Sequence, residues 1–195
     1  MSLRFVTSNG HKFAEAKSIL NGYGVSIDPL NLAIEEKRSE SCARVAEASA
    51  KIAYEKARVP LFVEDSGIFL NALHGFPGTY SAWAFGKMGY EGLLKLMRGV
   101  RDRRARFVSA IAYADEKGVK IFEAACRGKI SGRPAGKNGF GYDPIFIPSG
   151  SRKTFAEDAA TKARVSHRRR ALGCFAKWYV EKNNRKGKII GKEKS

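Results

Sequence analysis

The chain has 195 residues, with 36 Lys and Arg against 19 Asp and Glu, and a formal net charge of +17. No segment approaches the roughly 20 apolar residues of a membrane span, and three widely spaced cysteines exclude a zinc finger or a disulfide framework. A surface this basic attracts polyanions, but charge alone does not choose among nucleic acid, anionic membrane and phosphorylated small molecules.

The N-terminal segment has the pattern of an α/β unit. Residues 3–6 form a short apolar run, and a polar turn at residues 7–10 leads into a helical pattern that ends at Gly22 and Gly24. Because this start is a strand, without a charged leader followed by an apolar run, no signal peptide is expected and we predict a cytoplasmic protein.

The next segment predicts a helix, a strand and a loop. The helix spans about 42–58, a short buried strand follows at 61–64, and residues 74–80 form a loop. The inner stripe of the helix consists of Val45, Ser49, Ile52 and Ala53. The cysteines are expected to be small buried apolar residues, namely Cys42, Cys126 and Cys174.

The second half predicts a short helix, a hairpin and a last helix. The short helix covers 89–99, and the β-rich runs 107–114 and 119–126 flank a turn. Another strand lies within 139–148, and the last helix starts at about His167. Its buried face consists of Ala171, Leu172, Phe175, Trp178 and Tyr179.

This order predicts an α/β fold with an elongated mixed β-sheet, flanking helices and two lobes around a central cleft. Residues 1–182 are expected to form one two-lobed domain. Residues 183–195 are basic, polar and interrupted by glycine, so we expect a flexible tail.

The first candidate site is the polar turn where the first strand leads into the first helix. Free backbone N–H groups and the helix dipole favour an anion at such a helix start, so the turn can hold phosphate. The alternative is that these side chains only cap the helix. The segment consists of Thr7, Ser8, Asn9, Gly10, His11 and Lys12.

The second candidate is Glu64-Asp65-Ser66-Gly67, which follows the buried strand. Ligands of α/β sheets gather at the carboxyl ends of strands. A carboxylate there can hold Mg²⁺ beside substrate phosphates or take a proton from an attacking water. The alternative is a solvated turn.

The third candidate is the glycine-flanked Phe140 within residues 137–144. The two glycines leave room for a flat group, on which the ring could stack. The alternative is a glycine bulge at a strand start. Residues 132–138 only superficially resemble a P-loop, because the spacing is one residue short and no Ser or Thr follows the lysine.

The fourth candidate is Lys162 with Ser166-His167-Arg168, whose side chains can donate hydrogen bonds to purine carbonyl groups. The alternative is a helix capped by Ser166 and followed by a basic first turn. Cations are unfavourable at a helix N-terminus, so we interpret the basic cluster around residues 162–170 as a place where an anion binds.

In their order along the chain, the motifs resemble one family, the inosine/xanthosine triphosphate pyrophosphatases, and particularly its archaeal members. The similarity extends from about Leu3 to Tyr179. The matching segments are Thr7–Lys12, Val63–Gly67, Asn71–Ser81, Gly139–Phe146, Thr154–Glu157 and Ser166–Arg168.

The resemblance implies an elongated two-lobed α/β fold, usually a homodimer, and a Mg²⁺-dependent reaction. Such enzymes hydrolyse the non-standard purine nucleoside triphosphates ITP, dITP and XTP to the monophosphate and diphosphate, which cleanses the nucleotide pool. A purine nucleoside triphosphate is thus the expected partner, and no membrane or specific nucleic acid is expected.

The resemblance also assigns roles to residues. It implies that Thr7 through Lys12 hold the triphosphate and that Asp65, with Ser66 beside it, is the catalytic carboxylate and a metal ligand. Lys51 matches a phosphate-facing lysine. The segment expected to pack on the base consists of Phe140, Gly141, Tyr142 and Asp143. The residues expected to read the base are Lys162, His167 and Arg168.

Two departures from the family pattern concern the metal and the second helix. If the family pattern is aligned without a gap, its first metal carboxylate falls on Lys37, and a shift of one residue places it on Glu36. We choose Glu36 because lysine cannot ligate Mg²⁺, and Glu35 is the alternative. An acidic pair at the start of the second helix is replaced by Cys42-Ala43, a change expected to affect only capping.

Two other functions compete with the pyrophosphatase. A nucleic-acid-binding protein would explain the charge of +17 but not the adjacent carboxylates Glu64 and Asp65. A phosphatase with similar parts would release orthophosphate.

Overall fold

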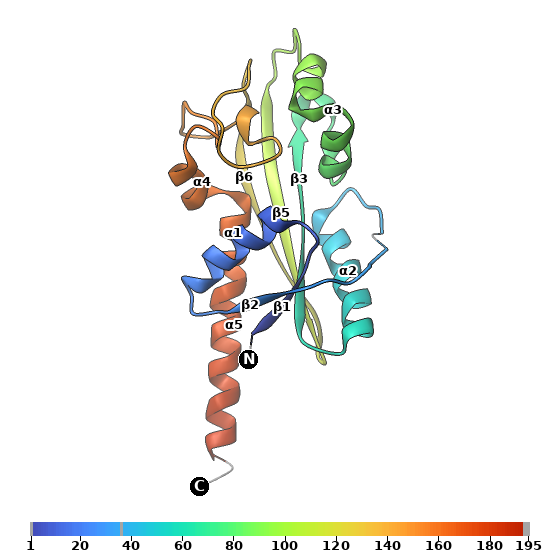
Figure 1. Cartoon of the computed structure of the whole chain (residues 1–195), viewed down its shortest axis with the longest axis vertical. Helices are drawn as coiled ribbons and strands as arrows, with labels where there is room; N and C mark the ends of the chain where they lie inside the picture. The colour runs from blue at the N-terminus through green and yellow to red at the C-terminus, as the bar shows by residue number, and fades with distance from the viewer. Residues whose placement is uncertain (1, 36, 193–195) are drawn as a thin grey trace.

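The structure, a computed structural model, describes residues 2–35 and 37–192, with side chains to residue 185 (Figure 1). Its centre is a mixed sheet with strand order β2-β1-β3-β5-β6-β7, and β4 pairs with β3 outside this path. The first three strands in this order run parallel, and the other pairs are antiparallel. The strands are β1 Leu3–Val6, β2 Ile27–Leu30, β3 Leu61–Leu70, β4 Pro77–Gly78, β5 Arg104–Asp115, β6 Gly118–Ile130 and β7 Phe146–Pro148.

Helices cover both faces of the sheet. In Figure 1, α1 and α5 lie along one side of the molecule, α2 lies on the other, and α3 and α4 flank the upper part. The helices are α1 Gly10–Asn21, α2 Cys42–Ala57, α3 Ser81–Leu96, α4 Ala159–Val165 and α5 His167–Lys192. Short 3-10 turns at Asn71–Leu73 and Asp143–Ile145 complete the chain.

Three apolar cores follow from this layering. One packs α1 and α5 against the sheet around Phe62 and Phe175, and a second packs α2 against the opposite face around Val63. A third core fills the upper part around Phe146 and Phe155. The long strands β3, β5 and β6 run through both parts, so the two lobes share one sheet, as predicted.

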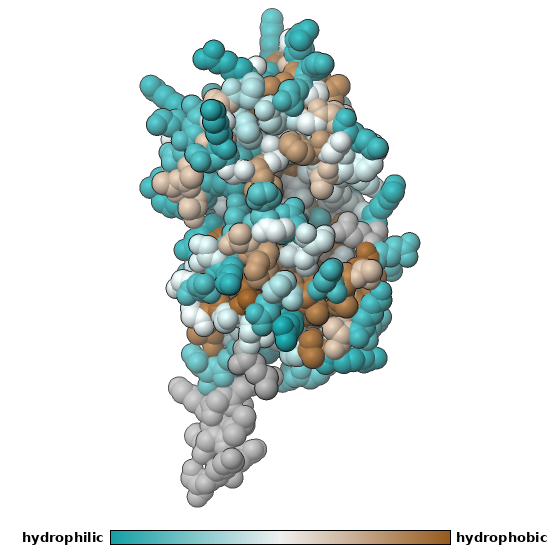
Figure 2. Space-filling view, in the orientation of Figure 1, coloured by the Kyte–Doolittle hydropathy of each residue, from teal (hydrophilic) through white to brown (hydrophobic). Residues whose placement is uncertain are grey.

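The face of the molecule seen in Figure 2 is largely polar. Figure 2 shows hydrophilic side chains projecting around most of the outline on this face, with apolar patches between them. No helix within residues 2–35 and 37–192 is long and apolar enough to cross a membrane.

The main correction to the predicted elements concerns β3. The sequence predicts a strand that ends at Glu64, before residues that are polar or glycine, but the strand continues to Leu70. Antiparallel pairing with β5 extends along its whole length, from Leu61 with Ala114 to Leu70 with Ala105. Asp65 therefore lies in the middle of a strand, where its position is fixed by the ladder on β5.

Other differences are smaller. β2 and α4 were not predicted, and α3 begins at Ser81, with a break at Gly89, instead of at residue 89. Cys174 is exposed, whereas Cys42 and Cys126 are buried as expected. The backbone of α5 is helical to Lys192, so the segment expected as a glycine-interrupted tail continues the last helix; its flexibility stays a prediction.

The approach of β4 to β3 beside the polar residues requires glycine at position 67. A Cβ atom there would overlap the carbonyl group of Gly78, whose position is fixed by a hydrogen bond from Ser81 Oγ at 2.6 Å. Ser81 Oγ in turn accepts a hydrogen bond from the Ile68 amide at 2.8 Å.

We therefore expect Gly67→Ala to lower the free energy of unfolding by about 1–3 kcal/mol through overpacking, as measured by urea unfolding. The control is Gly132→Ala, because a Cβ atom at Gly132 meets nothing within 4 Å. Equal stabilities of the two variants would contradict the close approach.

Candidate active site

Three adjoining cavities meet at Asp65. The aromatic cavity, of about 470 Å³, lies between the lobes and includes Phe107 and Phe140. The helix-start cavity, of about 290 Å³, lies at the beginning of α1 and includes Thr7. The loop cavity, of about 520 Å³, lies beneath the segment before α2 and includes Arg38. Asp65 lines all three, so a ligand that extends from one cavity to another passes this carboxylate.

The aromatic cavity brings together most of the predicted site residues, which come from β3, α1, the loop before β7, α4 and α5. The predicted residues that line it are Asn9, His11, Lys12, Asp65, Ser66, Phe140, Gly141, Tyr142, Asp143, Lys162, His167 and Arg168. The helix-start cavity adds Thr7 and Ser8. Gly10 begins α1 beside them but lines none of the three cavities.

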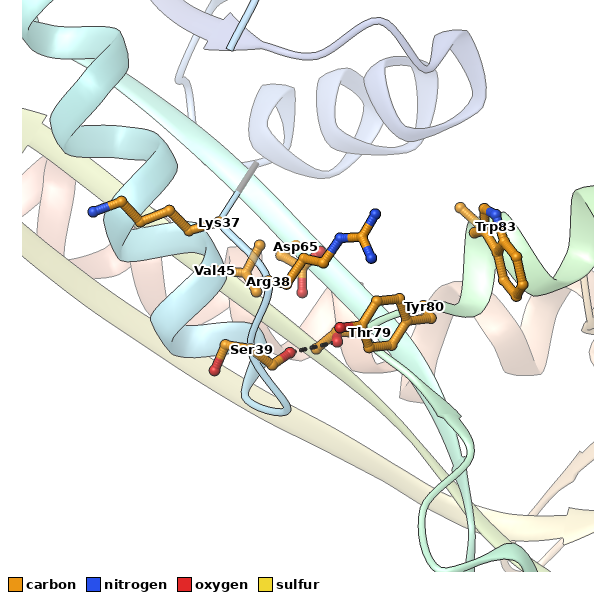
Figure 3. Close-up of a pocket in the computed structure, with 9 residues that line it drawn as sticks. Lys37, Arg38, Ser39, Val45, Asp65, Thr79, Tyr80 and Trp83 are labelled. Carbon is orange, nitrogen blue, oxygen red and sulfur yellow. Dashed lines mark hydrogen bonds between the residues drawn. The ribbon is translucent and has the colours of Figure 1, made fainter. Parts of the chain in front are cut away.

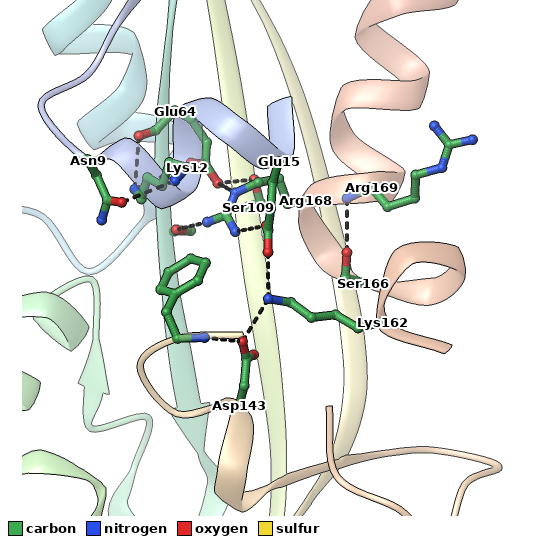
Figure 4. A network of polar contacts seen from close by, with 12 residues as sticks. Asn9, Lys12, Glu15, Glu64, Ser109, Asp143, Lys162, Ser166, Arg168 and Arg169 are labelled. Atoms are coloured by element: carbon green, nitrogen blue, oxygen red, sulfur yellow. Dashed lines mark hydrogen bonds and ion pairs between the residues drawn. The ribbon is translucent and has the colours of Figure 1, made fainter. Parts of the chain in front are cut away.

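Arg168, at the start of α5, is buried and donates hydrogen bonds in three directions (Figure 4). Its Nε contacts Glu64 Oε1 at 2.9 Å, its NH1 group contacts Glu15 Oε2 at 2.6 Å, and its NH2 group contacts Ser66 Oγ at 3.2 Å. A guanidinium group has five N–H donors, so two remain for a ligand.

Lys162, on α4, is held in the same way. Its ammonium group donates to Glu15 Oε1 at 2.5 Å and to Asp143 Oδ2 at 2.7 Å. Asp143 also accepts a hydrogen bond from the backbone N–H of Phe140 at 2.8 Å. This carboxylate therefore fixes the loop that carries Phe140, and the Lys162 ammonium lies 4.7 Å from the centre of that ring.

Glu64 is the most deeply buried acid of the group. It accepts hydrogen bonds from Ser109 Oγ at 2.8 Å and from Arg168, and Lys12 Nζ lies 3.4 Å from its second oxygen. Burial alone would raise the pKa of Glu64, but the charges of Arg168 and Lys12 and the Ser109 hydrogen bond outweigh it and lower the pKa to about 2.

These residues form one ion network of three cations and three carboxylates. Its members are Lys12, Lys162, Arg168, Glu15, Glu64 and Asp143. The network corrects our interpretation of the basic cluster, because the cations that reach the cleft are neutralised by acids of the protein itself. Glu15 was missed; the only signal was its position three residues after Lys12, on the neighbouring turn of α1.

His167 lies beside this network in a different environment. Its ring stacks on Phe107, with ring centres 4.6 Å apart, and its Nδ1 has no hydrogen-bond partner among the described residues. Burial, together with the neighbouring charge of Arg168, lowers the pKa of His167 well below its usual value. The imidazole is therefore neutral at pH 7, and the residue lines the aromatic cavity.

The loop before β7 provides the flat wall of the aromatic cavity. The Phe140 ring stacks on His11, with ring centres 5.0 Å apart and planes 12° from parallel. Tyr142 is buried, with its hydroxyl donating to the Ser81 carbonyl at 3.3 Å and its ring edge-on to Phe85. The residue thus supports the wall from behind.

The start of α1 has both features considered for this segment, capping side chains and a helix N-terminus that can hold phosphate. Asn9 Oδ1 accepts a hydrogen bond from the Lys12 amide at 3.1 Å, and Thr7 Oγ1 accepts one from the Asn9 amide at 3.1 Å. The Asn9 side chain therefore caps α1, the Thr7 side chain stabilises the turn before it, and both line the helix-start cavity with Ser8. The helix N-terminus faces that cavity, where it favours an anion.

Lys51 is not brought to the site. Its side chain is exposed on α2, its ammonium group contacts Glu47 at 2.6 Å, and it lines none of the three cavities. The inner residue of this turn is Ser49, which is buried and lines the helix-start cavity. Two residues later a helix has rotated by about 200°, which turns residue 51 outward.

The other face of β3 carries Asp65, next to Cys42 at the start of α2. Burial, and then the adjacent Asp65 carboxylate, raise the pKa of the Cys42 thiol, which stays protonated beside Asp65. The replacement of the acidic pair at this helix start therefore does more than alter capping, because it places a thiol against the candidate catalytic carboxylate.

The described residues provide few protein ligands for a magnesium ion. Glu36, the predicted second ligand, lies outside the described residues, and its alternative Glu35 is exposed. No cluster of three or more His, Cys, Asp or Glu side chains suited to a metal occurs in the part of the chain described. Mg²⁺ commonly needs only one or two protein carboxylates beside substrate phosphates, so Asp65 suffices as its protein anchor.

Residues 3–178 match the model of the Ham1 family. The chain belongs to the Ham1 family. It is 44% identical over 190 residues to the dITP/XTP pyrophosphatase of Methanopyrus kandleri, covering 96% of this chain and 100% of that protein. It is 45% identical over 182 residues to the dITP/XTP pyrophosphatase of Thermococcus kodakarensis, covering 93% and 98%.

A solved structure supports this membership. The chain superposes on a HAM1 protein from Coxiella burnetii with a TM-score of 0.79 and 29% identity, covering 92% of this chain and 99% of that one. Membership of the Ham1 family confirms the resemblance seen in the sequence motifs.

In this Ham1 family protein, the low pKa of Glu64 makes stability depend on pH. The folded state favours the carboxylate, so the stabilisation is complete above the ordinary value of 4.5 and is lost as the pH falls through about 2. We expect Glu64→Gln to lower the free energy of unfolding by about 3 kcal/mol at pH 7. At pH 3 the loss should be smaller than at pH 7 by about 2 kcal/mol.

Urea unfolding of both proteins at both pH values measures this difference. The control is Glu55→Gln, which removes an exposed carboxylate on α2 and should leave stability unchanged at either pH. A loss for Glu64→Gln that is the same at pH 7 and pH 3 would show that Glu64 is not held as a carboxylate.

Proposed function

We propose that this chain hydrolyses ITP, dITP and XTP to the nucleoside monophosphate and diphosphate. The relatives named dITP/XTP pyrophosphatase match nearly the whole chain, which supports the same reaction here. The observation that carries the proposal is the position of Asp65, between a cavity with aromatic walls and a cavity at a helix N-terminus. A purine suits the first cavity and a phosphate chain the second.

In this arrangement the α-phosphate lies at Asp65. The carboxylate orients or deprotonates a water molecule, which attacks the α-phosphorus in line with the departing oxygen. The bond between the α-phosphorus and the bridging oxygen breaks, and diphosphate leaves toward the start of α1. The protonated Cys42 thiol lies beside Asp65, where it can donate a hydrogen bond to this carboxylate.

The base is selected by hydrogen-bond donors. Adenine presents an amino donor at position 6, whereas hypoxanthine and xanthine present a carbonyl acceptor. The two remaining N–H groups of Arg168 and the neutral His167 supply donors to that carbonyl, while an amino group would face donors without an acceptor. Phe140 and His11 provide ring faces for stacking beside them.

A magnesium ion is part of this proposal. Asp65 would hold it, with Glu36 as the proposed second ligand, and when bound the ion neutralises charge on the phosphates and on the departing group. We also propose a homodimer located in the cytoplasm, as the sequence analysis expected. Sedimentation of the purified protein and fractionation of cells test these two points.

The first test is the substitution Asp65→Asn. We expect it to remove most of the ITP hydrolysis, on the order of a thousandfold, because the general base and metal ligand are lost. Chromatography of the products with ITP and Mg²⁺ should give IMP and diphosphate for the wild type. Near-normal turnover by the folded variant would refute the role of Asp65, release of orthophosphate would indicate a phosphatase, and no product would favour a nucleic-acid-binding protein.

The second test concerns Lys12, which lines both the aromatic and the helix-start cavities. We expect Lys12→Ala to weaken binding of the triphosphate by on the order of tenfold, because a charge-assisted hydrogen bond to the phosphate chain is lost. Binding of the monophosphate should weaken by less. Calorimetric titration with a non-hydrolysable ITP analogue and with IMP measures both. Equal losses would place Lys12 away from the β- and γ-phosphates.

A further inference from the structure

The described site is short of positive charge for a polyphosphate. The three cations of the ion network are paired with three carboxylates, of which Glu64 and Asp143 have buried side chains, and Asp65 adds a further negative charge. Lys51 is exposed and paired with Glu47 outside the cavities. A nucleoside triphosphate is a polyanion, so protein cations outside this network can add to the charge of the proposed magnesium ion in binding it.

The loop cavity contains such a cation. Arg38 is exposed and lines this cavity with Asp65, and its guanidinium group makes no ion pair or hydrogen bond with any residue that the structure describes. Figure 3 shows this group on the side of Asp65, whereas the neighbouring Lys37, which also lines the cavity, extends away from Asp65. Among the described residues that line the loop cavity, Asp65 is the only acid.

The loop that carries Arg38 is attached to the rest of the protein on both sides. Thr79 Oγ1, in the loop before α3, donates a hydrogen bond to the Ser39 carbonyl at 2.6 Å. Lys56 Nζ, on α2, donates one to the Ala33 carbonyl at 2.8 Å. The backbone next to Arg38 is thus held against the upper lobe, which keeps this side chain at the mouth of the cleft.

We propose that Arg38 binds the β- and γ-phosphates of the substrate, which rests on the proposed function. A guanidinium group matches two phosphate oxygens with parallel hydrogen bonds, and it stays charged at any relevant pH. The loop cavity and the helix-start cavity share Val45, Asp65 and Ala82, so from the loop cavity Arg38 faces the phosphate chain that the proposed function places at the start of α1. It supplies the positive charge that the ion network, neutral in itself, does not.

The test is calorimetric titration of the full chain with inorganic tripolyphosphate, which requires neither turnover nor a base. We expect Arg38→Gln to weaken tripolyphosphate binding by on the order of tenfold, because one charge-assisted contact is lost. Arg38→Lys should weaken it by less. The control is Arg101→Gln, which makes the same chemical change at an exposed position outside all three cavities and should leave binding unchanged.

Kinetics with ITP add a second measurement. Arg38→Gln should raise KM more than it lowers kcat, and should weaken IMP binding less than tripolyphosphate binding, because IMP lacks the outer phosphates. Unchanged tripolyphosphate binding in Arg38→Gln, an equal loss in Arg101→Gln, or no tripolyphosphate binding by the wild type would each overturn the proposal. Failure of the wild type to convert ITP would refute the proposed function instead, while the tripolyphosphate titration would still decide the role of Arg38.

Discussion

The alternating contacts of three cations with three carboxylates hold the site together. Arg168 joins α5 to Glu64 on β3 and to Glu15 on α1, and Lys162 joins α4 to Glu15 and to the loop held by Asp143. Buried charges are tolerated only when paired, and removing one leaves its partner uncompensated at a cost of about 3–5 kcal/mol. The network therefore ties together α1, β3, α4, α5 and the loop before β7, all of which line the aromatic cavity.

The network also divides the cleft by charge. On the buried side the ions neutralise one another, so this part can receive an uncharged purine without attracting anions in general. His167 and the ring of Phe140 complete it with a neutral donor and a flat face. Toward solvent the α1 N-terminus and Arg38 are where we propose that the phosphate chain binds, and their exposure suits strongly hydrated phosphates. Asp65 lies at the boundary between the two parts, where the proposed reaction places the α-phosphorus.

Much of the fold and part of the candidate site could be predicted from the sequence. Apolar periodicity located β1, α1, α2 and the β5–β6 hairpin, and the polar motifs located Asp65 and His167. The continuation of β3 could not be predicted, because polar residues and glycine are typical of turns and only the pairing with β5 makes them a strand. Glu15 was equally hidden, since its partners Lys162 and Arg168 lie 147 and 153 residues away along the chain.

The errors on α2 show what a resemblance of short motifs leaves open. A local match assigned Lys51 to the phosphates, but the buried stripe through Val45 and Ser49 sets the rotation of the helix, and that rotation turns residue 51 to solvent. The same stripe brings Cys42, which seemed to matter only for capping, against Asp65. The rotation of a helix about its axis, which its buried residues set, decides which of its side chains reach the cleft. For a functional residue on a helix, this rotation is a better guide than a match of the neighbouring residues in the sequence.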